Sequence, residues 1–313
     1  MISTQLNAAV KAWTLADSIY GKRNVALRWK NKIRFSLLAC TRSKDSMEWF
    51  SQLEDPGMHP FIAKFPGLIF KPMRAYLSIR WDVSQRKKVI WDTYQLIRKY
   101  PAFQNALLDS NGTVIARYQL ENYGELSITL CYHHVIFKEG ELMVILKNNS
   151  LNKEIYKMAF SFQQMPDGDF TCYIGCIQGG GADKNDEIKA ATKAMYGLRP
   201  CAFMIFIARE IISAMGIRTT KLLGVGNSIH PFKKKHLIHL PSVHQIDFDY
   251  NSFWLESNGE PGKDGWFSLP IKTERREKHE MKSNKRAMYN RRYAMMDTFA
   301  EQIHDAIGTP RQN

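Results

Sequence analysis

The sequence predicts an α+β fold, an antiparallel β-meander with packed helices that follows a helical N-terminal region. Three observations predict it. Short β-rich runs separated by turn residues fill the middle of the chain, the first third has helical periodicity, and 313 residues suffice to bury a sizeable core. With 44% hydrophobic and 24% charged residues, the composition is that of a globular protein and excludes wholesale disorder.

Positive charge is concentrated at the two ends of the chain. Residues 1–110 carry 18 basic and 8 acidic side chains, residues 111–270 carry 16 of each, and residues 271–313 carry 10 and 6. We therefore predict a basic, mainly helical N-terminal region (1–110), an α+β core (111–270) and a basic C-terminal helical segment (271–313). A neutral core between two basic ends favours an anionic partner.

The N-terminal region is predicted to be helical over residues 8–38, which contain no proline. An apolar side chain recurs there at every fourth position, at Val25, Trp29, Ile33 and Leu37. Basic residues border this apolar stripe, an arrangement that suits an anionic membrane surface. The alternative, which is the commoner one for amphipathic helices, is that Trp29 packs into the protein's own core.

The remaining elements follow from turn residues and periodicity. Residues 54–73 are rich in proline and glycine and are predicted to be a loop, and residues 81–100 a helix stopped by Pro101. Five β-rich runs predict the antiparallel meander: 112–120, 124–133, 141–147, 155–162 and 170–177. Helices over 187–196 and 200–215, and short strands over 221–225, 253–255 and 266–269, complete the core.

The fifth β-rich run leads into three successive glycines and then a helical segment. Glycines let backbone N–H groups approach an anion, and a helix start adds a favourable dipole. The pattern is neither a P-loop nor a dinucleotide-binding fingerprint, and glycine runs more often serve simply as turns. The candidate ligand-binding residues at this bend and the neighbouring strand end are Gln178, Gly179, Gly180, Gly181, Arg199 and Asn227.

The order of strand, glycine-rich turn, helix, strand and helix resembles the coenzyme-binding half of acetyltransferase-like folds. The resemblance implies that the glycine bend takes a pyrophosphate and that the strand over 221–225 diverges to admit a pantetheine arm. Acyl-coenzyme A or acyl-carrier protein is accordingly the hypothetical acyl donor. This inference is an analogy at the level of the fold.

His230 is the candidate catalytic residue, as a general base, because it follows a predicted strand end and imidazole suits proton transfer. A structural role is the alternative. No metal site is predicted: His133 and His134 face opposite sides of a strand, and the histidines over 230–244 have no nearby cysteine. A serine-hydrolase motif is absent, and Cys172 and Cys176 are predicted to be core side chains on one strand face.

The basic ends supply the candidate residues for binding an anionic surface: Arg23, Arg28, Lys30, Arg275, Arg276, Arg286, Arg291 and Arg292. Tyr289 and Tyr293 lie among the last of these on a predicted helix. Basic residues with interleaved aromatics suit a nucleic-acid backbone or phosphorylated lipid headgroups. A solvated terminal helix with Glu–Lys pairing is the third interpretation.

The cysteines and the hydropathy pattern indicate the compartment. Five cysteines, with no Cys-x-x-Cys pair, predict reduced thiols rather than a disulfide framework. No apolar run reaches the length of a signal peptide or of a membrane span. We therefore expect a cytoplasmic protein without a transmembrane segment, which makes peripheral contact with the inner membrane if its basic ends bind anionic lipid.

Several segments that follow one another along the chain resemble the VirK/YbjX family of enterobacterial proteins. The resemblance runs from about residue 70 to about residue 300, and the segments are 74–78, 174–179, 189–195, 197–200, 224–225 with Asn227 and His230, 249–256, 264–267, 285–287 and 291–293. It implies an association with virulence, with envelope or surface-protein phenotypes and with tolerance of cationic antimicrobial peptides. It implies no particular reaction and no catalytic residue.

Two functional hypotheses follow. The first is an acyltransferase-like protein, active or degenerate, that modifies or senses an envelope component or its precursor. The second is a non-enzymatic basic protein that binds RNA or an anionic membrane surface and regulates surface-protein expression. The glycine bend motivates the first hypothesis, and the charge of the two ends motivates the second.

Overall fold

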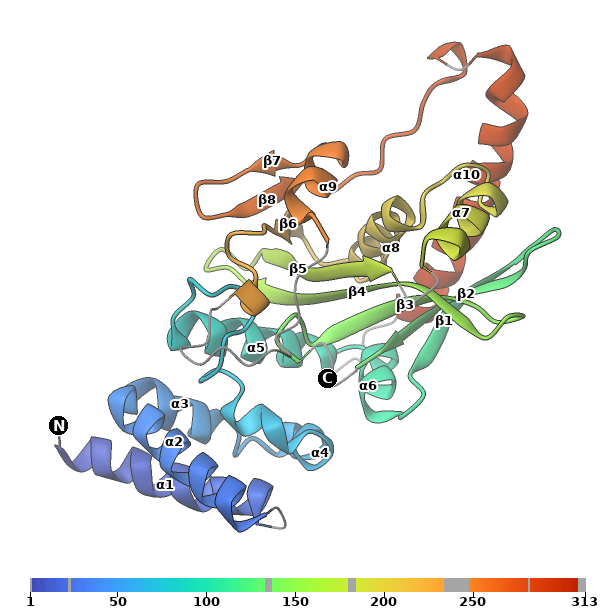
Figure 1. Cartoon of the computed structure of the whole chain (residues 1–313). Helices are drawn as coiled ribbons and strands as arrows, with labels where there is room; N and C mark the ends of the chain where they lie inside the picture. The colour runs from blue at the N-terminus through green and yellow to red at the C-terminus, as the bar shows by residue number, and fades with distance from the viewer. Residues whose placement is uncertain are drawn as a thin grey trace.

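The protein is built around one sheet, seen in a computed structural model that describes residues 2–21, 24–132, 137–179, 184–233, 248–280 and 282–308 (Figure 1). Its strands are β1 Thr113–Leu120, β2 Gly124–Cys131, β3 Leu142–Asn148, β4 Lys153–Gln164, β5 Phe170–Gly179, β6 Thr219–Val225, β7 Glu260–Pro261 and β8 Trp266–Leu269. The strand order is β1-β2-β3-β4-β5-β6-β8-β7, and β5 and β6 are the one parallel pair among these strands. The α+β prediction and the five-stranded meander are confirmed.

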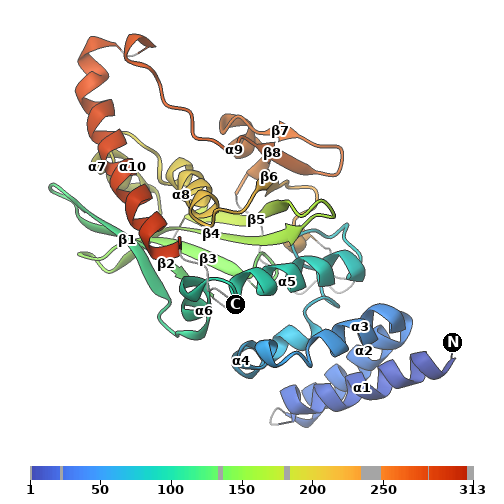
Figure 2. The same ribbon diagram turned by 180° about the vertical axis from the view of Figure 1, so that it is seen from behind.

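The helices pack on both faces of this sheet, and the first three helices lie beyond α5 on one side of it (Figure 1). They are α1 Ile2–Tyr20, α2 Val25–Thr41, α3 Ser43–Gln52, α4 His59–Lys64, α5 Val83–Ile97, α6 Pro101–Leu108, α7 Lys184–Ala194, α8 Pro200–Ala214, α9 Tyr250–Glu256 and α10 Arg286–Ile307. Helices α5 and α8 lie on opposite sides of β4 and β5 in both views (Figures 1 and 2). Helices α1 to α3 form a further layer, which contacts α5 through α3.

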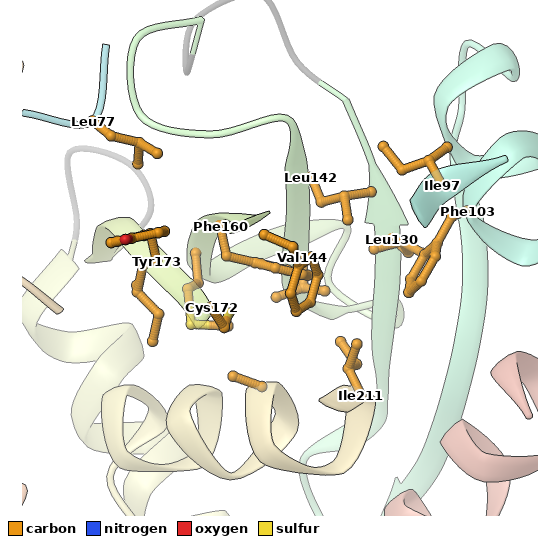
Figure 3. Packing of buried hydrophobic residues seen from close by; sticks show 14 of the residues in the cluster. Leu77, Ile97, Phe103, Leu130, Leu142, Val144, Phe160, Cys172, Tyr173 and Ile211 are labelled. Carbon is orange, nitrogen blue, oxygen red and sulfur yellow. The ribbon is translucent and has the colours of Figure 1, made fainter. Parts of the chain in front are cut away.

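Alternation along β4 explains how one strand serves two helical layers. Phe160 and Phe162 point to one face of the sheet, and Ser161 and Gln163 point to the other. On the second face Gln163 accepts a hydrogen bond from Gln85 of α5 at 2.9 Å. On the first face Phe160 and other strand side chains meet Ile211 of α8 in the core (Figure 3), where Phe160 and Ile211 are at most 1% exposed.

Several predicted elements differ from the structure. The helical prediction over 8–38 is confirmed, but two helices fill that range, because α1 ends at Tyr20 and the Asn24 side chain caps a new helix by accepting from the Ala26 N–H at 2.9 Å. The strand over 253–255 is wrong, because the Asp249 carboxylate caps α9 there. The predicted loop over 54–73 contains the short helix α4. Pro101 begins α6, because the backbone N–H that proline lacks would make no hydrogen bond within the helix at this first position.

The apolar stripe of α2 does not face the core. Val25, Trp29, Ile33 and Leu37 are all exposed, with Trp29 at 51%, whereas α2 buries Phe35 and Ala39. The core-packing interpretation of Trp29 is therefore wrong.

The edge strand β1 is covered by the last helix. The side-chain amide of Gln302 in α10 accepts a hydrogen bond from the Arg117 N–H at 2.8 Å and donates one to the Arg117 carbonyl at 2.9 Å. These are the two bonds that a neighbouring strand residue would make. Phe299 of α10 packs on Tyr118 beside them, with ring centroids 5.9 Å apart.

A buried ion pair ties the segment before α5 to the sheet. Lys71 Nζ lies 2.7 Å from Glu141 Oε1, and the two side chains are 1% and 0% exposed. The rings of Tyr76, Tyr132 and Phe137 surround the ammonium group at 4.9–5.4 Å. Burial lowers the pKa of Lys71, and the Glu141 carboxylate opposes that shift. Each member of this buried ion pair depends on the other, because no water is available to solvate the charge that would remain if one partner were removed.

We predict that Lys71→Met destabilises the protein by about 3–5 kcal/mol, because it leaves the Glu141 carboxylate buried without a cation. The double variant Lys71→Met/Glu141→Leu should recover much of that loss, since it removes both charges. Urea unfolding at neutral pH measures both effects. A Lys71→Met protein as stable as the natural one would show that the pair has no such role.

Candidate functional site

The parallel strands β5 and β6 separate before β5 ends. Their pairing runs from Phe170 opposite Thr219 to Ile174 opposite Gly224, whereas β5 continues along β4 as far as Gly179. Strand β6 goes on to pair Val225 with Trp266 of β8. On the side away from β4, residues 175–179 have no neighbouring strand within the described parts of the chain.

A β-bulge at Gly175 marks the point of separation. Against β4, Ile174 pairs with Phe160 and Cys176 with Ala159, so Gly175 is an extra residue. A Cβ atom at Gly175 would lie 2.1 Å from the Glu139 carbonyl oxygen and 2.4 Å from Leu77 Cδ2. Only glycine allows this approach, and bulges bend the strand that carries them. The bulge also places Cys172 and Cys176 on opposite faces, so the prediction that they share a face is wrong.

Four titratable side chains lie buried where the strands part: Glu139 from the β2–β3 connection, Cys176 of β5, His230 after β6, and Tyr250 at the start of α9. Each is at most 4% exposed. His230 Nε2 lies 3.3 Å from Glu139 Oε1, and the His230 and Tyr250 rings stack with centroids 5.0 Å apart. Tyr250 and Glu139 both lie close enough to Cys176 to influence the pKa of its thiol. We call these four residues the buried polar cluster.

The environment keeps two members of the buried polar cluster protonated. Burial, and after it the Glu139 carboxylate, raises the pKa of the Cys176 thiol well above its usual value. Burial likewise raises the pKa of the Tyr250 hydroxyl well above its usual value. Both groups are therefore proton donors at neutral pH, and Cys176 is no resting thiolate nucleophile.

His230 is held between the backbone and Glu139. Its Nδ1 accepts the Phe232 N–H at 3.4 Å, which in the neutral ring leaves the proton on Nε2, facing Glu139. Nε2 has no hydrogen bond of good angle with any described residue. A buried imidazole nitrogen beside a carboxylate, at the end of a strand, suits proton transfer.

The segment before α5 joins the two loops that carry Glu139 and His230. The Leu77 N–H donates to the Lys138 carbonyl at 2.7 Å, and the Ile79 N–H donates to the Ile229 carbonyl at 2.8 Å. The Lys71–Glu141 ion pair anchors the same segment and the same connection. The buried polar cluster is thus positioned by backbone hydrogen bonds from a part of the chain far away in sequence.

Part of the predicted ligand-binding set lies at the same end of β5. Gly179 pairs with Tyr156 of β4. Burial raises the pKa of the Tyr156 hydroxyl, and the positive charge of Arg199 at the start of α8 opposes that rise. Arg199 itself is exposed and donates to Glu256 at 2.8 Å, which raises its pKa. Gln178 pairs with Lys157. Gly180 and Gly181 lie outside the described residues.

Asn227 connects the end of β6 to α9. Its side chain accepts from the Tyr250 N–H at 3.0 Å and donates to Asp249 at 2.8 Å, and its backbone N–H donates to Asn251 at 2.9 Å. These bonds position Tyr250, so Asn227 supports the buried polar cluster. Ligand binding by Asn227 stays a prediction.

The candidate residues for an anionic surface lie at two opposite ends of the molecule. In both views, α2 lies at one end, and the start of α10 with the segment before it lies at the other (Figures 1 and 2). Arg28 is bonded to Asp17, Arg275 to Asp297, Arg276 to Tyr289 and Arg292 to the Tyr196 carbonyl. Lys30, Arg286 and Arg291 are exposed, and Arg23 lies outside the described residues. The two basic ends therefore do not form one continuous face.

Sequence reasoning missed three of the four members of the buried polar cluster. Nothing near Glu139 in the sequence marks it as functional, and its place depends on contacts with Gly175. Cys176 lies in an apolar run and Tyr250 in an aromatic-rich segment, both typical of core positions. No cluster of three metal-ligating side chains occurs within the described ranges, and none of the helices described there is long and apolar enough to cross a membrane.

The fold and the site define an α+β protein with one mixed sheet and a buried polar cluster at the carboxyl end of its parallel strands. The chain belongs to the DUF535 family, a protein family of unknown function whose model matches residues 25–305. It is 26% identical over 274 residues to the uncharacterized protein YbjX of Escherichia coli K12, covering 86% of this chain and 81% of YbjX. No solved structure matches the chain.

Two uncharacterized proteins of Haemophilus influenzae are also similar to the chain. One is 30% identical over 234 residues, which is 74% of each protein. The other is 26% identical over 313 residues, with 95% of this chain and 96% of the relative covered. The similarity to the second of these relatives therefore extends over nearly the whole chain.

We predict that the core thiols resist alkylation in the folded protein. Iodoacetamide at mildly alkaline pH should modify the half-buried Cys40, whereas Cys131, whose pKa burial raises to about 12, and Cys176 should react only after unfolding in urea. Peptide mass spectrometry measures the modification. Labelling of Cys176 in the folded protein as fast as that of Cys40 would contradict the burial of the cluster.

Proposed function

We propose that the protein is an acyltransferase-like transferase, which takes an acyl group from acyl-coenzyme A or acyl-carrier protein. The observation that carries the proposal is the separation of β5 and β6 at the Gly175 bulge, with titratable groups gathered beside it. Where the parallel strands separate, backbone N–H and C=O groups have no strand partner. The extended pantetheine arm of an acyl donor can form hydrogen bonds with such groups. Ligands of sheets with parallel strands commonly bind at the carboxyl ends of those strands.

The buried polar cluster supplies the proton transfers that acyl transfer needs. A hydroxyl or amine of the acceptor attacks the thioester carbonyl carbon, forming a C–O or C–N bond while the C–S bond breaks. Glu139 takes the proton that the acceptor loses, and the Nε2–H of His230 faces the Glu139 carboxylate and positions it. Tyr250, which its high pKa keeps protonated, donates a proton to the leaving thiolate. No redox step is involved.

The anionic part of the donor is assigned to the far end of β5. Gln178 and Gly179 lie there, and the start of α8 with Arg199 adds positive potential. Gly180 and Gly181 belong to this assignment by sequence alone. The acceptor we propose is an envelope component or its precursor, because of the likeness to VirK-type virulence-associated proteins. In that setting the protein acts in the cytoplasm, and its effect on the cell is tolerance of cationic antimicrobial peptides.

We predict that an acyl donor binds and stabilises the folded protein. At least one of acetyl-coenzyme A, palmitoyl-coenzyme A and acyl-carrier protein loaded with these groups should raise the Tm by about 2 °C or more, and free coenzyme A by less. Gly180→Asp should abolish the shift, because it introduces a carboxylate where phosphate is assigned. Asn111→Asp, which adds the same charge at a remote exposed turn, should keep it. If no donor shifts the Tm of the natural protein, the proposal is wrong.

We predict that Tyr250→Phe separates donor binding from transfer. The donor should still raise the Tm, whereas release of the donor thiol in the presence of host envelope extract should fall about a hundredfold, as expected for loss of a general acid. Tyr289→Phe, on α10, is the matched control and should keep the rate. Equal rates for Tyr250→Phe and the natural protein would remove Tyr250 from the mechanism.

A further inference from the structure

The first two helices expose most of the apolar surface of the protein. Of the 12 large apolar side chains exposed within the described ranges, eight belong to α1 and α2, the pair that we call the N-terminal hairpin. They are Ile2, Leu6, Val10, Val25, Leu27, Trp29, Ile33 and Leu37, and they are between 43% and 82% exposed. Solitary exposed apolar residues need no explanation, but a concentration on one element indicates a contact surface.

These side chains form one face rather than scattered points. All of them except Leu27 recur at every fourth residue, which aligns Ile2, Leu6 and Val10 on α1, and Val25, Trp29, Ile33 and Leu37 on α2. The Trp13 and Trp29 rings, 5.3 Å apart, place the two rows side by side. The residues buried in α1, at positions 8, 12 and 16, lie on a different face. We call the aligned residues the exposed apolar face.

The surroundings of the exposed apolar face are strongly cationic. Residues 1–41 contain seven basic side chains and one acidic side chain, Asp17. Asp17 is already bonded to Arg28 at 2.7 Å and Lys32 at 3.0 Å, and these contacts lower its pKa to about 2. Lys30 and Arg34 remain exposed on α2, among the apolar positions 29 and 33. An anion that covers the face thus meets positive charge with no free carboxylate to repel it.

We propose that the N-terminal hairpin docks flat on an anionic lipid bilayer. Acyl chains cover the aliphatic side chains, the tryptophans sit at the level of the headgroups, and Lys30 and Arg34 contact lipid phosphates. RNA matches the charge but leaves the Ile, Leu and Val side chains in water, since its surface is phosphate and sugar. The bilayer is the one partner that satisfies both the apolar and the cationic features, and this inference does not depend on the proposed acyl transfer.

Vesicle cosedimentation of the full chain tests the proposal. The protein should sediment with phosphatidylcholine vesicles that contain about one quarter phosphatidylglycerol, and much less with pure phosphatidylcholine or at high salt. Trp29→Ser/Ile33→Ser and Lys30→Glu/Arg34→Glu should each weaken binding about tenfold or more. The matched controls are Leu151→Ser for the apolar pair and Lys99→Glu/Lys263→Glu for the charged pair, and both should bind as the natural protein does.

Three results would overturn the proposal, provided that circular dichroism shows the proteins to be folded. The first is no retention of the natural protein on anionic vesicles. The second is tighter binding to single-stranded RNA than to vesicles, with Trp29→Ser/Ile33→Ser unaffected. The third is a dimer of the natural protein that becomes a monomer in Trp29→Ser/Ile33→Ser, because a second copy would then cover the exposed apolar face.

Discussion

The approach of the Glu139 backbone to Gly175 is the constraint on which the rest of the site depends. A carbonyl oxygen 2.1 Å from where a Cβ atom would stand leaves room for glycine alone, and the extra residue there bends β5 away from β6. The same contact brings Glu139 to Cys176 and His230. One steric requirement therefore fixes both where the parallel strands part and which ionisable groups lie beside the opening.

The charged groups around this contact are stabilised in two different ways. Glu141 is paired with Lys71 inside a ring of aromatic side chains, so its charge is neutralised within the fold. Glu139, two residues earlier, has a histidine and a thiol as neighbours instead. A buried carboxylate with a full ionic partner is a structural element, whereas one surrounded by groups that exchange protons is suited to chemistry. The short connection between β2 and β3 carries one of each.

The sequence predicted the meander well because turn residues punctuate it and each strand is a local pattern. It failed where a contact distant in sequence decides the outcome. The aromatic run of α9 has strong β-propensity, but the Asp249 cap and packing on β6 make it helical. The bulge at Gly175 cannot be read from its neighbours, so the face of Cys176 was assigned wrongly and Glu139 was overlooked. His230, by contrast, was identifiable, because its position after a strand end depends on local sequence alone. The apolar stripe of α2 was visible too, but only tertiary packing decides which way such a stripe points.

The side-chain amide of Gln302 has a consequence for how the protein behaves at high concentration. The outermost strand of a sheet offers unsatisfied N–H and C=O groups to any other extended chain, and such pairing leads to aggregates. By bonding both backbone groups of Arg117, α10 occupies the middle of β1 and leaves no continuous ladder for a foreign strand to extend. In a chain truncated before α10, the backbone N–H and C=O groups of β1 would be free to pair with another chain. The last helix therefore protects the protein against fibrous self-association.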